Sequence, residues 1–112
     1  MAGIATGAGA AHSASVSCSG GKASLGGSCS LKFTDSLFRK SGPKQVLQVC
    51  FSTPGPNTVK AKGKGAKGAC APTSKGGVAH GVFGRHAKGD ATVTATETLG
   101  GNTIATVTTV IH

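Results

Sequence analysis

The sequence predicts an all-β fold, an antiparallel sandwich of about seven short strands supported by disulfides. Short β-rich runs are separated by glycine and proline clusters at intervals of about 8–12 residues, which is typical of sandwiches. No segment sustains a helical period over several turns. Four cysteines, an even number in a small chain, predict two disulfides.

The composition allows one domain with a thin core. The chain has 112 residues, no Trp or Tyr and only four Phe, so Val, Leu and Ile must fill most of the interior. The cysteines are Cys18, Cys29, Cys50 and Cys70, and no Cys-x-x-Cys pair favours zinc. Disulfides in turn predict an extracytoplasmic protein.

Residues 1–14 are predicted to lie outside the fold, which leaves 15–112 as the domain. They are small and uncharged, and they resemble the second half of a secretory signal ending at a small-residue site, Ala14. Two interpretations remain open: a signal-peptide remnant or a disordered Gly/Ala tail. The segment is too short to span a bilayer, and no transmembrane segment is expected.

The first half of the domain contains three candidate strands. A short run at 14–18 is followed by Cys29–Thr34, which alternates between apolar and polar residues as a half-buried strand does. Residues 36–40 are compatible with a single helical turn. The next strand, 45–51, ends at the turn cluster Pro54–Asn57.

The second half predicts two long strands joined by a hairpin. Ala91, Val93 and Ala95 alternate with threonines, so we expect them to face the core. Gly100 and Gly101 lie between two β-branched runs and can take the positive φ angles of a primed turn.

Two segments carry a resemblance to a known family. Thr73–Ala79 contains a threonine, glycines and Val-Ala, and Ala87–Ala95 contains an Ala-x-Gly turn that leads into Val-Thr-Ala. Together with Val49–Phe51 and Pro54-Gly55, this pattern resembles the bacterial immunoglobulin-like domains that repeat in invasin- and intimin-type surface proteins. The resemblance implies an immunoglobulin-like sandwich, here as a single secreted module.

The cysteines are not part of that family's pattern. An antibody-type bridge would join the second strand to the strand holding Val93, where no cysteine is present. We therefore favour two pairs between neighbouring strands, Cys18–Cys29 and Cys50–Cys70.

The charge is strongly basic, with 12 Lys plus Arg against three acids and a net charge of +9. This excess favours anionic partners such as teichoic acid, lipid headgroups or extracellular DNA. A biased segment, interpreted as a mobile basic loop or an edge strand, supplies the candidate ligand-binding residues Lys60, Lys62, Lys64 and Lys67.

Other cations would join this site if they lay at the same end of the fold: Lys75, Arg85 and Lys88. The alternative is a solvated loop without a ligand. Sequence-specific nucleic-acid binding is not expected, because neither stacking aromatics nor a recognition helix accompanies the lysines.

Catalysis has little support. The three acids, Asp35, Asp90 and Glu97, are far apart in sequence, so no carboxylate pair stands out for acid–base work. There is no Gly-x-Ser-x-Gly motif. His80 and His86 would offer at most two metal ligands, so no metal or cofactor is expected.

These observations predict a secreted, non-enzymatic binding or adhesion module of a bacterial cell surface. Its expected partner is an anionic cell-envelope polymer or another surface protein. The alternative is a cationic secreted effector, antimicrobial or toxin-like, that acts on anionic membranes. A secreted hydrolase or its inhibitor has no residue support, and the sequence does not predict an oligomeric state.

Overall fold

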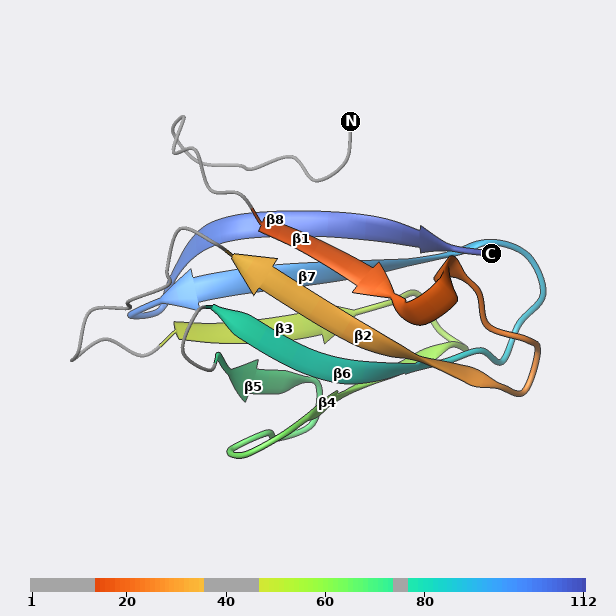
Figure 1. Cartoon of the computed structure of the whole chain (residues 1–112), viewed down its shortest axis with the longest axis horizontal. Helices are drawn as coiled ribbons and strands as arrows, with labels where there is room; N and C mark the ends of the chain where they lie inside the picture. Colours follow the sequence, from red (N-terminus) through yellow and green to blue (C-terminus); the bar gives the residue numbers. More distant parts are fainter. Residues whose placement is uncertain (1–13, 36–46, 74–76) are drawn as a thin grey trace.

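The structure of the chain is a computed structural model that describes residues 14–35, 47–73 and 77–112. In these ranges two four-stranded sheets pack face to face (Figure 1). A short 3₁₀ turn, η1 (Ser19–Gly21), follows the first strand. The strands are β1 (Ala14–Cys18), β2 (Ser28–Asp35), β3 (Leu47–Ser52), β4 (Thr58–Lys62), β5 (Cys70–Pro72), β6 (Val78–Gly84), β7 (Ala91–Leu99) and β8 (Asn102–Ile111).

The sheet topology confirms the predicted immunoglobulin-like sandwich. Sheet A has the order β1-β2-β6-β4, sheet B has the order β5-β3-β7-β8, and all paired strands are antiparallel. Without β5, this is the seven-strand arrangement of constant-type immunoglobulin domains, ABED on one sheet and CFG on the other. The three-residue β5 is an addition to that arrangement, inserted in the chain between β4 and β6 and paired with β3.

The core lies between the sheets and follows the predicted alternation. In β2, Leu31 and Phe33 are buried, and in β7 Val93 and Ala95 have no exposed surface. The large rings of Phe33 and Phe83 from sheet A face Val49, Val93 and other aliphatic residues from sheet B. Full burial of a Val, Leu, Ile or Phe side chain contributes about 1.5–3 kcal/mol to the free energy of folding. A core with few aromatic residues therefore depends on its aliphatic side chains.

The two faces that point outward differ in chemistry. The outer face of sheet B is built largely of hydroxyl side chains, because the outward positions of β7 are Thr92, Thr94, Thr96 and Thr98. Three of these rows continue onto β8, where Thr94 pairs with Thr108, Thr96 with Thr106 and Thr98 with Thr103. The outer face of sheet A carries lysines, as described below.

The β7–β8 hairpin also forms as predicted. Leu99 pairs with Asn102, and the two residues between them, Gly100 and Gly101, have φ angles of 59° and 88°. Positive φ at both central residues is what a type I′ turn requires. The predicted helical turn at 36–40 lies outside the described residues, as does the predicted tail 1–14 except for Ala14, which begins β1.

Two disulfides join Cys18 to Cys29 and Cys50 to Cys70, the two pairs favoured from the sequence. The first is buried between β1 and β2, and both of its cysteines face the core. The second joins directly opposed residues of β3 and β5 on the outer side of sheet B. It therefore fixes the added strand β5 to the sheet.

Gly81 in β6 leaves room for the core ring of Phe51. A Cβ at this position would lie 2.8 Å from the carbonyl oxygen of Lys60 and 3.0 Å from the Phe51 ring. Because the contacted oxygen is backbone, Gly81→Ala must shift β4 or the ring. We expect it to destabilise the fold by about 1–3 kcal/mol, despite the usual entropic benefit of replacing glycine.

Urea unfolding of Gly81→Ala would measure this loss. Ser30→Ala is the control, since Ser30 is exposed on the outer face of the neighbouring strand β2. Equal midpoints for the two variants would show that the close contact at Gly81 has no energetic weight.

Candidate functional site

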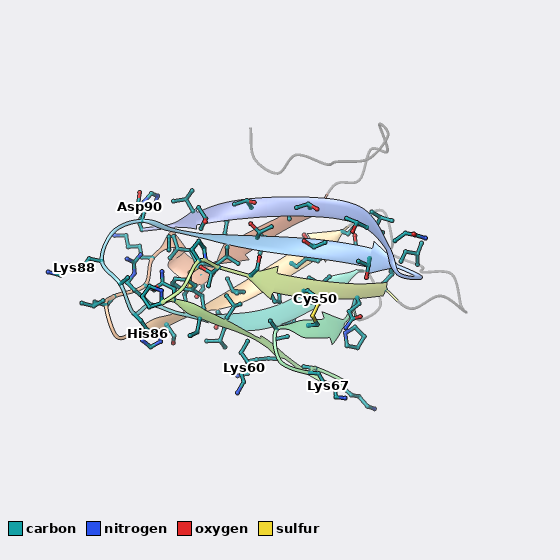
Figure 2. All side chains as sticks on the ribbon, turned by 180° about the vertical axis from the view of Figure 1, so that it is seen from behind. Cys50, Lys60, Lys67, His86, Lys88 and Asp90 are labelled. Atoms are coloured by element: carbon teal, nitrogen blue, oxygen red, sulfur yellow. A yellow bond between two sulfur atoms is a disulfide. The ribbon has the colours of Figure 1, made fainter. Side chains whose placement is uncertain are left out.

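The four lysines singled out in the sequence lie together at one edge of the sandwich. Lys60 and Lys62 are exposed on β4, the edge strand of sheet A, and Lys64 and Lys67 are exposed in the turn that leads to β5. Figure 2 shows Lys60 and Lys67 pointing into solvent along this edge. The predicted edge strand is thus present, and the rest of the biased segment is a turn.

Backbone hydrogen bonds hold this turn against the body of the protein. The Ala61 amide donates to the Gly68 carbonyl at 2.8 Å, and Lys67 and Cys70 exchange amide–carbonyl bonds of 2.8 and 3.0 Å. Gly63, Gly65 and Gly68 take positive φ angles of 113°, 82° and 57°, which the tight path requires. The Cys50–Cys70 disulfide anchors the far end of the turn.

Another lysine and a histidine extend the cationic surface across sheet A. Lys32 of β2 pairs with His80 of β6, and His80 pairs with Lys62 of β4, and all three residues are exposed. Since neighbouring strands lie about 4.8 Å apart, the Lys32 and Lys62 backbones are separated by about 10 Å. We call the surface formed by Lys32, Lys60, Lys62, Lys64, Lys67 and His80 the lysine face.

The acidic side chains are all placed away from the lysine face. The chain has three, and the structure describes each of them. Asp35 and Glu97 are fully buried, and Asp90 lies in the loop before β7, at the end of the sandwich marked by Lys88 and His86 (Figure 2). The lysines therefore have no acidic side chain beside them to neutralise their field.

A hollow of about 440 Å³ opens beside the lysine face. It forms because the pairing of β4 with β6 ends at Lys62 and His80, whereas β6 extends back to Val78. The chain leaves sheet A at this point and crosses to β5 in sheet B. The residues that line the hollow are Lys62, Gly63, Lys64, Gly65, Pro72, Thr73, Val78, Ala79 and His80.

The structure corrects the expectation that no carboxylate pair exists. Asp35 ends β2 in sheet A and Glu97 lies in β7 of sheet B, and both point into the interior with no exposed surface. Each continues an inward series: Asp35 follows Leu31 and Phe33, and Glu97 follows Val93 and Ala95. Strict alternation, carried two residues further, would have placed both acids inside.

Burial has a large effect on Glu97. The pKa of Glu97 is raised from 4.5 to about 9, chiefly by desolvation and in part by the neighbouring Asp35 carboxyl. Both carboxylate oxygens of Glu97 are buried, beside the Asp35 carboxyl. Glu97 is therefore uncharged at neutral pH, which agrees with its position in the core.

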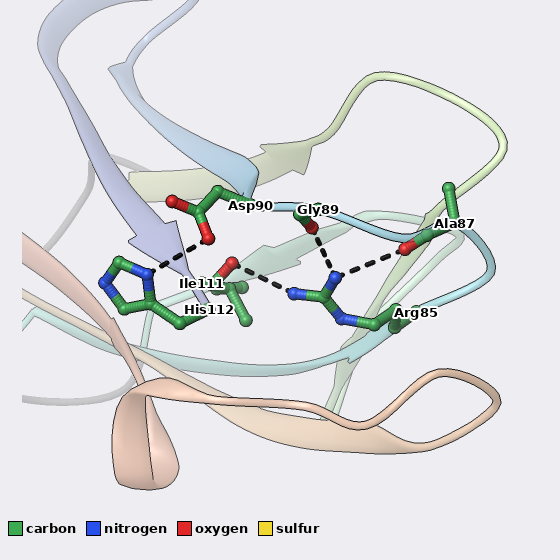
Figure 3. Close-up of polar contacts among 6 residues, drawn as sticks. All are labelled: Arg85, Ala87, Gly89, Asp90, Ile111 and His112. Atoms are coloured by element: carbon green, nitrogen blue, oxygen red, sulfur yellow. Dashed lines mark hydrogen bonds and ion pairs between the residues drawn. The ribbon is translucent and has the colours of Figure 1, made fainter.

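Arg85 closes the opposite end of the sandwich and is not part of the cationic surface. Asp35 lies beside Gly77, before β6, and Arg85 follows β6, so the whole strand separates the two ends. The guanidinium is buried and donates to the carbonyls of Ala87, Gly89 and Ile111, the last at 3.0 Å (Figure 3). The condition for Arg85 to join the lysines, a position at the same end of the fold, is therefore not met, and backbone carbonyls hold its side chain inside.

Lys88, like Arg85, belongs to the end opposite the β4–β5 turn, as Figure 2 shows, so it too does not join the lysines. Lys75 lies outside the described residues. At the Arg85 end, the imidazole Nδ1 of His112 lies 3.1 Å from Asp90 Oδ1, and both side chains are well exposed (Figure 3). An exposed pair of this kind contributes little to stability.

The two candidate metal-binding histidines are placed on different parts of the molecule. His80 lies on the outer face of β6, whereas His86 follows the strand in a loop whose His86 and Ala87 amides donate to the Asn57 side chain at 2.7 and 3.1 Å. Within the described residues, no group of three or more His, Cys, Asp or Glu could hold a metal ion.

The described part of the chain contains no helix with the length and apolarity needed to cross a membrane. No family model matches the sequence, and no curated protein matches it. Among solved structures, the fold is similar to that of a lipoprotein from Bacteroides thetaiotaomicron known from solution NMR. The TM-score is 0.60 and the identity 12%, and the match covers 95% of this chain and 84% of that one. At this identity the likeness shows the fold alone.

Proposed function

We propose that this protein is a secreted, non-enzymatic binding module that attaches through its lysine face to an anionic polymer of the cell surface. The observation that carries the proposal is the separation of charge. Five exposed lysines share one face and its adjoining turn, while two of the three acids are buried and the third lies at an end. Lysines spaced at about the Debye length act jointly on a polymer of phosphates or sulfates.

The burial of the other ionisable groups supports a binding role over a catalytic one. The carboxyl pair of Asp35 and Glu97 has no exposed surface, so a substrate has no access to it. Arg85 is likewise occupied by backbone carbonyls. The two disulfides favour an extracytoplasmic compartment, where such polymers occur.

Removal of lysines should weaken polyanion binding in a salt-dependent way. Each lysine that contacts a phosphate contributes roughly 0.7–0.9 to the slope of log K against log salt for nucleic-acid polyanions. Replacing Lys60, Lys62, Lys64 and Lys67 together with Gln should therefore lower the slope by up to about 3. Titration of inorganic polyphosphate at several salt concentrations would measure it.

A matched pair of double variants provides the control. Lys60→Gln with Lys62→Gln removes two charges from the lysine face, and Lys22→Gln with Lys88→Gln removes two exposed charges from elsewhere. If both pairs lowered the slope equally, net charge alone would govern binding and the proposed face would be rejected.

The alternative, an effector that acts on anionic membranes, makes a different prediction. In the described residues the exposed large apolar side chains are Leu25 and Val110, which lie on the β1–β2 loop and on β8, away from the lysine face. A surface of this kind adsorbs to charge without inserting. Dye-loaded vesicles of phosphatidylglycerol should stay intact with the protein bound, and rapid dye release would favour the effector.

A further inference from the structure

We propose that the hollow beside the lysine face binds an anionic amphiphile, a ligand with an acyl chain that ends in a phosphate or carboxylate. The inference deepens the polymer-binding function proposed above and rests on it, because the two share Lys62 and Lys64. The hollow would let the protein select ligands by shape, whereas the lysine face attracts any anion by charge.

The hollow has two chemically distinct parts. Pro72, Val78 and Ala79 line its apolar part, and Lys62, Lys64 and His80 carry nitrogen groups at its margin. Its volume of about 440 Å³ falls in the range of about 300–1,000 Å³ that is usual for small-molecule sites. Apolar walls with a few polar groups on one side match a molecule that is itself apolar at one end and charged at the other.

The shape of the hollow follows from the strand crossover and is held in place. Gly65 packs so closely on Pro72 that a Cβ there would lie 3.0 Å from the proline Cγ, which brings the turn against β5 as one wall. The amide of Thr73, on the same side, donates to the Leu47 carbonyl at 3.1 Å. The Cys50–Cys70 disulfide fixes β5 to β3. It therefore holds both the β5 wall of the hollow and the end of the lysine-bearing turn that leads into β5.

The charge balance selects an anion over a neutral or cationic amphiphile. Lys62 and Lys64 are exposed, and among the described residues no acidic side chain lines the hollow; Asp35, which ends β2 near Val78, is buried in the interior. An apolar chain would gain about 25 cal/mol for each Å² of its surface removed from water, and the terminal anion would gain charge-assisted contacts. Neither contribution alone explains a pocket with both kinds of lining.

The experiment compares four probes by isothermal titration: octyl phosphate, octanol, inorganic phosphate and vesicles of phosphatidic acid. We expect octyl phosphate to bind at least about tenfold more tightly than octanol or inorganic phosphate. If substitutions in the hollow weakened binding to the vesicles as well as to octyl phosphate, the ligand would be a membrane lipid. If the protein bound octyl phosphate but not the vesicles, the ligand would be a soluble amphiphile. Equal affinity for octyl phosphate and inorganic phosphate, or for octyl phosphate and octanol, would overturn the proposal.

Two sets of variants separate the hollow from the wider lysine face. Lys62→Gln with Lys64→Gln should weaken octyl phosphate binding about tenfold, whereas Lys60→Gln with Lys67→Gln, which removes the same charge outside the hollow, should leave it unchanged. Val78→Phe, or Thr73→Phe if the first variant does not fold, should fill the hollow and abolish octyl phosphate binding while polyphosphate binding persists. If the parent protein bound octyl phosphate but did not bind polyphosphate, the function proposed for the lysine face would be rejected.

Discussion

The free energy of unfolding should fall as the pH rises from about 5 to about 9, and Glu97→Gln should remove most of this dependence. The pKa of Glu97 is raised from 4.5 to about 9 in the folded protein, chiefly by burial. Between these values the folded state holds a proton that the unfolded state releases, so unfolding is favoured as the pH rises. The slope for a single group approaches 1.4 kcal/mol for each pH unit.

The sign of this effect is opposite to that of an acid in a salt bridge. A buried, neutral carboxyl gives its full stability below pH 4.5 and loses it as the pH approaches 9. Guanidinium unfolding at pH 5, 7 and 9 would measure the trend. The comparison with Glu97→Gln isolates the buried pair of Glu97 and Asp35, because groups outside this pair affect both proteins equally.

Asp90→Asn is the matched control, since it removes an acid that is well exposed at the opposite end of the sandwich. It should leave the pH dependence close to that of the parent protein. Stability curves for Glu97→Gln that ran parallel to those of the parent would show that Glu97 ionises normally in the folded state.

Loss of either disulfide should destabilise the domain by about 3 kcal/mol. The bridges close loops with sequence separations of 11 and 20 residues, for which the chain-entropy model gives similar values. Removing both would cost a large share of the roughly 5–15 kcal/mol that stabilises a small domain. Thermal unfolding of the Cys18→Ala/Cys29→Ala and Cys50→Ala/Cys70→Ala proteins would measure each contribution.

The two disulfide variants should differ in function although they are similar in stability. Only Cys50–Cys70 anchors the turn that carries Lys64 and Lys67. Its loss should weaken polyphosphate binding at a temperature where both variants remain folded. Four reactive thiols in the native protein, before any reduction, would contradict both bridges.

Alternation and turn chemistry made most of the fold predictable. The alternation of Ala91, Val93 and Ala95 predicted a strand with one buried face, and the two glycines predicted a hairpin turn. Both are present in the sandwich. Local patterns do not reveal which strands become neighbours. The short β5 could not be predicted, because three residues carry no period and β5 depends on its pairing with β3.

The candidate site was predictable only in part for the same reason. The lysine run is visible in the sequence, but the row of Lys32, His80 and Lys62 exists only because β2, β6 and β4 are adjacent. Arg85 has the charge of a surface residue, and its burial depends on carbonyls of the loop that follows it and on the carbonyl of Ile111, which lies 26 residues away at the end of β8. Asp35 and Glu97 meet because two sheets pack, which no spacing within one strand records.

The threonine surface of sheet B has a consequence for the attachment proposed above. A molecule held through its lysine face must direct the opposite sheet, with Thr94, Thr96 and their partners on β8, toward the surroundings. Each bound copy would thus replace a patch of negative charge with uncharged hydroxyls. A dense layer would mask the polymer from cations and present a hydrated exterior of low charge.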